Sequence, residues 1–233
     1  MFTGSSEFYD LLYSFKDYRK EAEEITALIQ SRNKDCKTVL DIACGTAEHH
    51  RFLREQFSMD GIDLNETFIE TARKKNREGN YSVADMKDFT TGKKYDAVIC
   101  LFSSIGYLHD AGELRAAVTW FARHLDKNGL LIIEPWFTKE HSRERRTGML
   151  TYEADDLKIC RLSHSYPEGD FSVLHFEYLV ATAKDGIRHF SEKHLLRMFS
   201  VGEIMQAMTE AGFETVYDEK GLTGRGLYTG IKT

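Results

Sequence analysis

The sequence from Thr38 to Glu48, TVLDIACGTAE, decides the fold. Its first part, residues 38–43, is mainly β-branched or apolar, which is typical of a strand buried on both faces at the middle of a parallel sheet. A turn of small residues around Gly45 follows, and residues 48–57 have the polarity and length of a helix. A strand, a glycine turn and a helix in this order predict a Rossmann-like α/β sheet, which binds its ligands at the carboxyl ends of its strands.

Asp41 indicates which kind of ligand this turn receives. A turn that binds a dinucleotide reads GxGxxG, because backbone N–H groups must approach a pyrophosphate closely. This turn contains only Gly45, and the carboxylate of Asp41 would repel a pyrophosphate. A carboxylate suits a ligand that carries an ammonium and a sulfonium group, as S-adenosylmethionine does. The alternative is that Asp41 only caps the turn.

Composition excludes several classes of protein. The 233 residues fit a single domain with an elaboration, and a net charge of −6 without a basic block argues against nucleic acid as the main partner. The four cysteines lie far apart, with no CxxC pair or histidine grouping, so we expect a reduced, cytoplasmic protein without a metal site. The sequence shows no secretion signal and no run of about 18 apolar residues, so we expect no membrane span.

Two further acids follow predicted strands. Asp63 ends a strand over residues 59–64, about 20 residues beyond the glycine turn, where an acid can accept hydrogen bonds from two ribose hydroxyls. Asp85 follows a strand over residues 81–84, and it can accept from an adenine amino group while Met86 covers the ring. Asp85 is also compatible with a turn cap. Three acids at three successive strand ends favour one shared ligand.

The remaining pattern completes an α/β sheet and adds an insertion. We expect helices over residues 7–18, 20–30, 113–125 and 201–211 and after Asn65, and strands over residues 95–101, 129–134 and 226–231 with a further one from Gly212. After Pro135 the pattern changes. Three strand-like runs begin between residues 157 and 190 and are joined by PEGD and AKDG turns. This pattern predicts an inserted antiparallel β meander.

Several strings together resemble one enzyme family. They are FYDLLYSFKDY (8–18), LDIACGTAEH (40–49), VADMKDF (83–89), LFSSIGY (101–107), GIRHFSEKHL (186–195) and TGRGLYTG (223–230). Over essentially the whole chain the sequence looks like the class I methyltransferases that N,N-dimethylate TDP-linked 3-amino-deoxysugars. The cofactor strings are shared by class I methyltransferases generally, whereas the later strings are much narrower. The family turn usually reads CGTGxH, and here Ala47 replaces its second glycine.

The resemblance implies one methyltransferase domain over residues 1–233, with a mostly parallel sheet whose last strand is antiparallel. The N-terminal helices (1–32) would form a lid, and the insertion (136–197) would form an antiparallel sheet that binds the acceptor. The cofactor would be S-adenosyl-L-methionine. The acceptor would be the amine of a nucleotide-linked amino sugar, which receives one or two methyl groups, and the protein could form a homodimer.

The resemblance also assigns residues to the two ligands. The cofactor would contact Tyr9, Tyr18, Asp41, Ala43, Gly45, Asp63, Leu64, Asp85, Met86 and Leu101. The acceptor would contact Tyr13, Tyr107, Trp136, Arg161, Ser163 and Arg225, with Arg225 at the phosphates. Tyr107 or His164 would accept the amine proton or orient its lone pair, and we favour orientation.

Three alternatives stay open on the sequence alone. A nicotinamide oxidoreductase would use the same sheet, although the chain lacks GxGxxG. A methyltransferase-like binding protein without activity would keep most of the motifs. Among methyltransferases, the acceptor could be another small amine or a hydroxyl.

Overall fold

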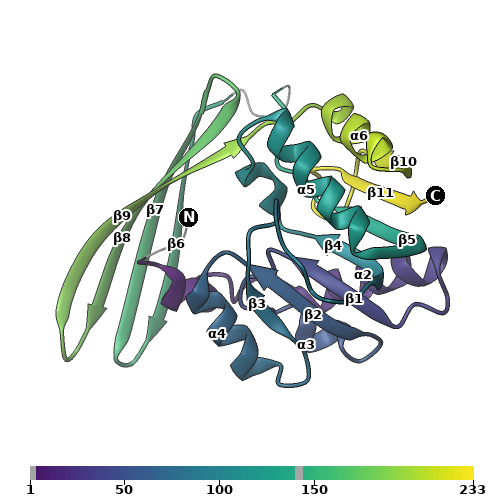
Figure 1. Cartoon of the computed structure of the whole chain (residues 1–233). Helices are drawn as coiled ribbons and strands as arrows, with labels where there is room; N and C mark the ends of the chain where they lie inside the picture. The colour runs from purple at the N-terminus through teal and green to yellow at the C-terminus, as the bar shows by residue number, and fades with distance from the viewer. Residues whose placement is uncertain (1–3, 140–143) are drawn as a thin grey trace.

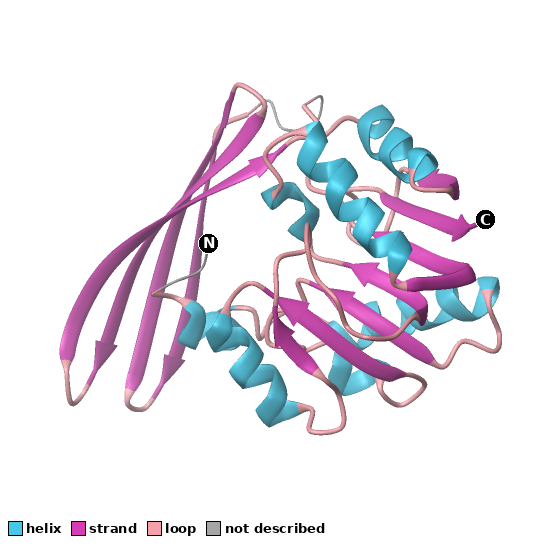
Figure 2. Cartoon of the chain, in the orientation of Figure 1, coloured by secondary structure: helices cyan, strands magenta, loops and turns pink. Residues whose placement is uncertain are grey.

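A computed structural model describes residues 4–139 and 144–233. The described residues form a seven-stranded sheet and a separate four-stranded sheet, which stands to one side of the first (Figures 1 and 2). Strands of the seven-stranded sheet are β1 (Thr38–Ile42), β2 (Ser58–Asp63), β3 (Tyr81–Val83), β4 (Tyr95–Cys100), β5 (Leu125–Ile133), β10 (Phe213–Asp218) and β11 (Leu227–Lys232). Their spatial order is β10-β11-β5-β4-β1-β2-β3.

The central strand is β1, as the apolar run predicts. It pairs in parallel with β2 on one side and with β4 on the other, so the strand order reverses next to Asp41. Ligands bind at such a reversal point in open α/β sheets. Strand β11 runs antiparallel to both of its neighbours, β5 and β10. The predicted class, a mostly parallel sheet with an antiparallel last strand, is confirmed.

Helices cover both faces of this sheet. They are α2 (Tyr18–Arg32), α3 (His50–Leu53), α4 (Glu66–Lys75), α5 (Ala111–Arg123) and α6 (Val201–Glu210). One apolar core lies between the sheet and helices α5 and α6, and a second lies between the sheet and helices α2 and α3. Asn65, Asp110 and Ser200 each accept a hydrogen bond at the N-terminus of a helix, which satisfies a backbone donor there.

Two predicted helices are shorter than expected. The region 48–57 contains only α3, with turn residues on either side of it, and the left-handed φ of +57° at Ala47 prevents the helix from extending toward β1. The region 7–18 is divided into η1 (Ser6–Phe8) and α1 (Tyr9–Leu12), and α2 then begins at Tyr18. A last short element, η2 (Ser104–Tyr107), follows β4.

The inserted sheet has four strands rather than the three predicted. They are β6 (Arg146–Ala154), β7 (Leu157–Glu168), β8 (Phe171–Thr182) and β9 (Gly186–Arg197), antiparallel and in chain order. We call the face that η1 and α1 contact the inner face and the other the outer face. On the inner face a small core joins Phe8 and Leu12 to Phe176, Tyr178 and Val180. The start of the chain therefore lies between this sheet and α4 (Figure 1).

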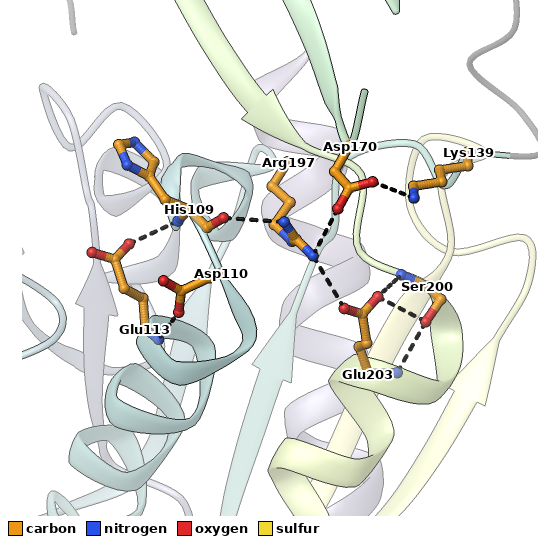
Figure 3. A network of polar contacts seen from close by, with 8 residues as sticks. All are labelled: His109, Asp110, Glu113, Lys139, Asp170, Arg197, Ser200 and Glu203. Carbon is orange, nitrogen blue, oxygen red and sulfur yellow. Dashed lines mark hydrogen bonds and ion pairs between the residues drawn. The ribbon is translucent and has the colours of Figure 1, made fainter. Parts of the chain in front are cut away.

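Arg197, the last residue of β9, joins the inserted sheet to the rest of the domain (Figure 3). Its guanidinium donates to the carbonyl oxygen of His109 at 3.1 Å and lies 3.2 Å from the Asp170 carboxylate and 3.5 Å from the Glu203 carboxylate. Asp170 also pairs with Lys139. One side chain thus holds together the β7–β8 turn, the loop before α5 and the start of α6.

Candidate active site

One cavity of about 670 Å³ lies at the carboxyl ends of the parallel strands, and it extends to the inner face of the inserted sheet. All the residues predicted to contact the cofactor line it, and so do all those predicted to contact the acceptor. His164 is the one predicted site residue that does not line it. The sequence strings thus come from distant parts of the chain to a single chamber.

The turn after β1 leaves open space above the strand ends. Ala43, Gly45 and Ala47 have φ angles of +58°, +57° and +57°. A Cβ atom added to Gly45 would meet nothing within 4 Å, so the missing side chain leaves room for a ligand rather than for packing. The turn therefore fits a cofactor that approaches the backbone closely.

Asp41 is buried at the end of β1, with 3% of its surface exposed. Its Oδ2 atom lies 3.0 Å from Nε2 of His50, and Nδ1 of His50 lies 2.7 Å from the hydroxyl of Tyr81. The contact to His50 holds this carboxylate in place, and Asp41 itself lines the cavity. Its hydrogen-bond partner within residues 4–139 and 144–233 is thus His50 rather than the turn backbone, which disfavours the capping alternative.

Asp63 links the ends of two strands to the cavity. Its Oδ2 accepts from the backbone N–H of Gly45 at 2.9 Å, and its Oδ1 accepts from that of Asn65 at 2.8 Å. Each carboxylate oxygen has a second lone pair, so the group can still accept from two hydroxyls. Burial raises the pKa of Asp63, and the charge of Asp41 adds to the increase.

Asp85 both caps its turn and lines the cavity. Its Oδ1 accepts from the backbone N–H of Lys87 at 2.9 Å, as the alternative interpretation predicts. Met86 lies beside it in the cavity wall and packs against the core below α5. A second lone pair on the carboxylate remains suited to an amino group, and the thioether suits an aromatic ring.

Aromatic side chains of the N-terminal segment, Tyr9, Tyr13 and Tyr18, line the cavity. The rings of Tyr9 and Tyr13 are 4.7 Å apart, and Tyr9 is 5.0 Å from the ring of Phe68 on α4. Burial raises the pKa of Tyr9 well above its ordinary value, and the neighbouring tyrosines raise it further. The Tyr9 phenol consequently stays protonated and acts as a hydrogen-bonding group.

Two guanidinium groups mark the other end of the cavity. Arg161, on β7, is 8% exposed, donates to the hydroxyl of Tyr13 at 3.0 Å and lies 4.5 Å from the ring centre of Phe176. Arg225 donates to Oγ of Ser103 at 2.6 Å. The rings of Phe102, Trp136 and Phe137 surround the Arg225 guanidinium at 5.4 to 5.7 Å.

Neither guanidinium has a carboxylate within 4.0 Å in the part of the chain that the structure describes. A buried cation such as Arg161 normally has an anionic partner, because removing an unpaired charge from water is costly, and the same holds to a lesser degree for the half-buried Arg225. This end of the cavity is therefore suited to an anionic ligand.

His164 lies on the outer face of the inserted sheet. Side chains alternate along a strand, and Arg161, Ser163 and Ser165 line the cavity, so His164 points away from it. Its ring is 5.1 Å from that of Tyr166. The position disagrees with the prediction that His164 accepts the amine proton. The imidazole beside Tyr107 is instead that of His194, with Nδ1 at 2.9 Å from the Tyr107 hydroxyl.

Sequence reasoning missed several residues of the cavity wall. They include Cys44, Thr46, Glu48, His49, Phe68, Lys87, Phe102, Ser103, Glu113, Leu174, Phe176 and Leu196. Most follow strand ends inside strings that the sequence already singled out, so proximity to those strings would have found them. His194 is different, because it does not line the cavity but lies behind Tyr107, and it is found only when the face of β9 that it shares with Glu192 is known.

Two features are not found in the described residues. No group of three or more His, Cys, Asp or Glu side chains within residues 4–139 and 144–233 is arranged to hold a metal ion. Over the same residues, no helix has both the length and the apolar character needed to cross a membrane.

Known proteins share this fold. Residues 39–129 match the family described as methyltransferase domain. The fold is that of a class I methyltransferase, an enzyme that uses S-adenosyl-L-methionine. The chain is 38% identical, over 97% of both sequences, to the dTDP-3-amino-3,4,6-trideoxy-α-D-glucopyranose N,N-dimethyltransferase of Streptomyces venezuelae. It belongs to the family of dTDP-amino-deoxysugar N,N-dimethyltransferases.

Solved structures agree with this assignment. DesVI of Streptomyces venezuelae matches over the full length of both chains, with a TM-score of 0.92 and 36% identity. The amino pentose methyltransferase CalS10 of Micromonospora echinaspora was solved with S-adenosylmethionine bound. It matches over 100% of this chain and 98% of its own, with a TM-score of 0.87 and 31% identity.

Proposed function

We propose that this enzyme methylates the amine of a dTDP-linked amino-deoxysugar, and that it adds two methyl groups in succession. The observation that carries the proposal is the division of charge along one cavity. Carboxylates of Asp41, Asp63 and Asp85 line one part of the cavity, and the guanidiniums of Arg161 and Arg225, which have no carboxylate partner among the described residues, line another. The first part suits a cationic donor, and the second suits the diphosphate of a sugar nucleotide.

The cofactor supplies an activated methyl group on a sulfonium centre. In our proposal the protein's side chains mainly position the two reactants, and such alignment is worth about 7–11 kcal/mol in well-oriented systems. Asp41 receives the ammonium group of the cofactor, Asp63 its ribose hydroxyls and Asp85 its adenine. Leu64, Leu101, Ala43 and Met86 shape the wall around it, and Gly45 leaves the space that it fills.

The N-terminal segment, within residues 1–32, is proposed as the lid of the cavity. Tyr9 and Tyr18 line its cofactor end, and Tyr13 reaches Arg161 at the acceptor end. A cover of this kind excludes water from the reacting groups. The inserted sheet, within residues 136–197, is proposed as the acceptor-binding surface, with Arg161 and Ser163 facing the ligand beside Trp136 and Arg225.

Tyr107 is proposed to orient the acceptor amine. Burial raises the pKa of Tyr107 well above its ordinary value, so the phenol keeps its proton and is a poor base. It can nevertheless accept a hydrogen bond from an amine N–H. The amine enters the reaction as the neutral form, whose lone pair is the nucleophile.

Mass spectrometry tests the proposed reaction directly. We expect the enzyme, given S-adenosylmethionine, to add two methyl groups to dTDP-3-amino-3,4,6-trideoxy-α-D-glucopyranose. The same amino sugar without its nucleotide should be a much poorer acceptor, because it lacks the diphosphate that the two guanidiniums receive. Equal methylation of the free sugar would contradict the proposal and favour a small-amine acceptor. Fluorescence titration with NADH is expected to show no binding, which distinguishes the enzyme from an oxidoreductase.

A homodimer through the outer face of the inserted sheet is also proposed. Met149 and Leu162 are direct neighbours across β6 and β7, and both are exposed, as is Leu179 on β8. Exposed apolar side chains gathered on one sheet face are typical of an interaction surface. Light scattering should give twice the mass of one chain, and Leu162→Lys should give monomers. A monomeric parent protein would contradict this assembly.

A cytoplasmic location is proposed on the state of the cysteines. Cys36, Cys44, Cys100 and Cys160 form no disulfide. Free thiols of this kind persist in a reducing compartment. Cell fractionation should recover the enzyme with the cytoplasmic proteins, and recovery with secreted proteins would contradict the proposal.

A further inference from the structure

Three side chains lie in a row behind the cavity wall. The hydroxyl of Tyr107 is 2.9 Å from Nδ1 of His194, and Nε2 of the same ring is 3.5 Å from Oε2 of Glu192. The side chains of His194 and Glu192 are almost completely buried. Both belong to β9, two positions apart, and therefore share one face of the strand. A carboxylate, an imidazole and a phenol thus form one buried array that ends at the cavity.

The carboxylate of this array is held by the start of the chain. Ser5 donates from its backbone N–H to Oε1 of Glu192 at 3.0 Å and from its hydroxyl to Oε2 at 2.7 Å. Ser5 directly precedes η1, whose Phe8 packs on the inner face of the inserted sheet. Glu192 is therefore connected to the proposed lid on one side and, through His194, to Tyr107 on the other.

The tautomer of His194 decides what Tyr107 presents to the cavity. A neutral imidazole carries its proton on one ring nitrogen. The Glu192 carboxylate beside Nε2 favours a proton there, and Nδ1 then accepts from the Tyr107 hydroxyl. The phenol oxygen can in turn accept from a group in the cavity. In the other tautomer Nδ1 donates to the phenol oxygen, and the hydroxyl proton turns to the cavity instead.

We propose that Glu192 and His194 are positioning residues that keep the Tyr107 oxygen as a hydrogen-bond acceptor toward the acceptor amine. This inference rests on the proposed function, because it requires an amine at that position. An amine that donates its N–H to Tyr107 keeps its lone pair available for the methyl group. The opposite tautomer would direct a hydroxyl proton at that lone pair and weaken the nucleophile. The array does not remove a proton from the amine. It determines whether Tyr107 accepts or donates the hydrogen bond that it forms with the amine.

Glu192→Gln tests the array with little change of shape. A glutamine amide can donate to Nε2 of His194, which moves the imidazole proton to Nδ1. Long-range proton–nitrogen NMR of the His194 ring, assigned with His194→Gln, reports the tautomer without any acceptor. We expect the proton on Nε2 in the parent enzyme and on Nδ1 in Glu192→Gln.

Kinetics measure the consequence for the reaction. With dTDP-3-amino-3,4,6-trideoxy-α-D-glucopyranose as acceptor, Glu192→Gln should lower kcat about 10- to 100-fold, the range expected when one buried hydrogen bond to the nucleophile is lost. The acceptor KM and the affinity for S-adenosylhomocysteine should stay within about twofold, because no ligand contact changes. In a Tyr107→Phe background the same substitution should cause no further loss.

The matched control lies on the opposite face of the same sheet. Glu177 contacts His175 at 2.9 Å and His189 at 2.7 Å, away from the cavity. Glu177→Gln should leave kcat unchanged, with its oligomeric state measured in parallel. An unchanged tautomer in Glu192→Gln, or an equal loss of kcat with and without the Tyr107 hydroxyl, would overturn the inference. A parent enzyme that methylates no dTDP-amino sugar contradicts the proposed function instead, and the NMR comparison still decides the tautomer.

Discussion

The backbone N–H of Gly45 donates to the carboxylate of Asp63 at 2.9 Å, so the turn after β1 is tied to the end of β2. The residue proposed to hold the cofactor ribose therefore also fixes the turn on which the rest of the cofactor would lie. A substitution at either position is expected to affect both. Variants at this end of the cavity are therefore paired with control variants, which separate an effect on folding from an effect on cofactor binding.

Asp63→Asn should weaken cofactor binding by about 1–3 kcal/mol, because an amide nitrogen cannot accept the hydrogen bonds that a carboxylate oxygen accepts. Isothermal titration with S-adenosylhomocysteine measures the change. Asp96→Asn is the matched control, since Asp96 also accepts from backbone N–H groups, those of Lys37 and Thr38, at the opposite end of the strands. Equal affinities for the parent and Asp63→Asn would remove the ribose assignment.

Cofactor binding should depend on pH through the raised pKa of Asp63. The ionised carboxylate is the form that accepts from hydroxyls, so affinity is full above this pKa and is lost as the pH falls through it. Because burial raises the pKa, the loss should begin at a higher pH than for an ordinary aspartate, whose pKa is about 3.9. Binding titrations of the parent enzyme and of Asp63→Asn over the acid range isolate the contribution of Asp63. If the two affinities fall in parallel as the pH falls, the pH dependence does not come from Asp63.

Arg225→Ala should raise the acceptor KM about 10-fold or more, since a charge-assisted hydrogen bond contributes about 1.5–3 kcal/mol. Arg225→Lys should recover only part of this, because a lysine lacks the planar fork. Cofactor affinity should stay unchanged. Arg123→Ala is the control, as Arg123 stacks on Trp120 at 4.5 Å outside the cavity. Loss of cofactor binding in Arg225→Ala would show that the residue is structural.

Gly45→Ala should destabilise the fold by about 1–2 kcal/mol, which is the cost of a side chain at a left-handed position. It should also weaken cofactor binding, because the new methyl group enters the open space of the turn. Gly92→Ala provides the comparison: Gly92 has φ +72° and equally open surroundings, but it does not line the cavity. Denaturant unfolding should show a similar loss of stability for the two variants. Calorimetry should show weaker cofactor binding for Gly45→Ala and unchanged binding for Gly92→Ala.

Arg197→Gln should lower the free energy of unfolding by about 1–3 kcal/mol, because three partners lose a charged donor. It should also raise the acceptor KM, since Arg197 aligns the inserted sheet with the His109 loop of the cavity wall (Figure 3). Lys139→Gln, which removes only the pair with Asp170, should do neither. Thermal unfolding and steady-state kinetics measure the two effects, and an unaltered KM would restrict Arg197 to a role in stability.

Much of the parallel sheet could be predicted because its strands are buried on both faces. Residues 38–42, 95–100 and 130–133 are runs of apolar side chains that few other structures accommodate. Strand β6 was missed because most of its side chains are exposed, and the alternation that indicates a half-buried strand is confined to its second half, residues 150–154. Its pairing with β7, rather than its own residues, keeps it in the sheet.

Some residues of the candidate site could likewise be predicted from the sequence, and others could not. Acids and glycine at strand ends, such as Asp41, Gly45 and Asp63, were found because a parallel sheet brings its carboxyl ends together. His164 was misplaced because one position along a strand exchanges the faces of the sheet, and the resemblance did not give the face. His194 was missed for the same reason. Contacts between remote segments, such as Ser5 with Glu192, follow only from the three-dimensional packing.

Among the described residues, no strand of the inserted sheet pairs with a strand of the parallel sheet. The sequence of the inserted sheet can therefore change without altering a strand pairing of the parallel sheet. On our proposal that the inserted sheet binds the acceptor, exchanging residues 146–197 for those of a relative should change the sugar preference and leave the cofactor end of the cavity unchanged. Chimeric enzymes that carry residues 146–197 of a relative are then expected to methylate that relative's amino sugar, provided that Arg197 and its acceptors are transferred together.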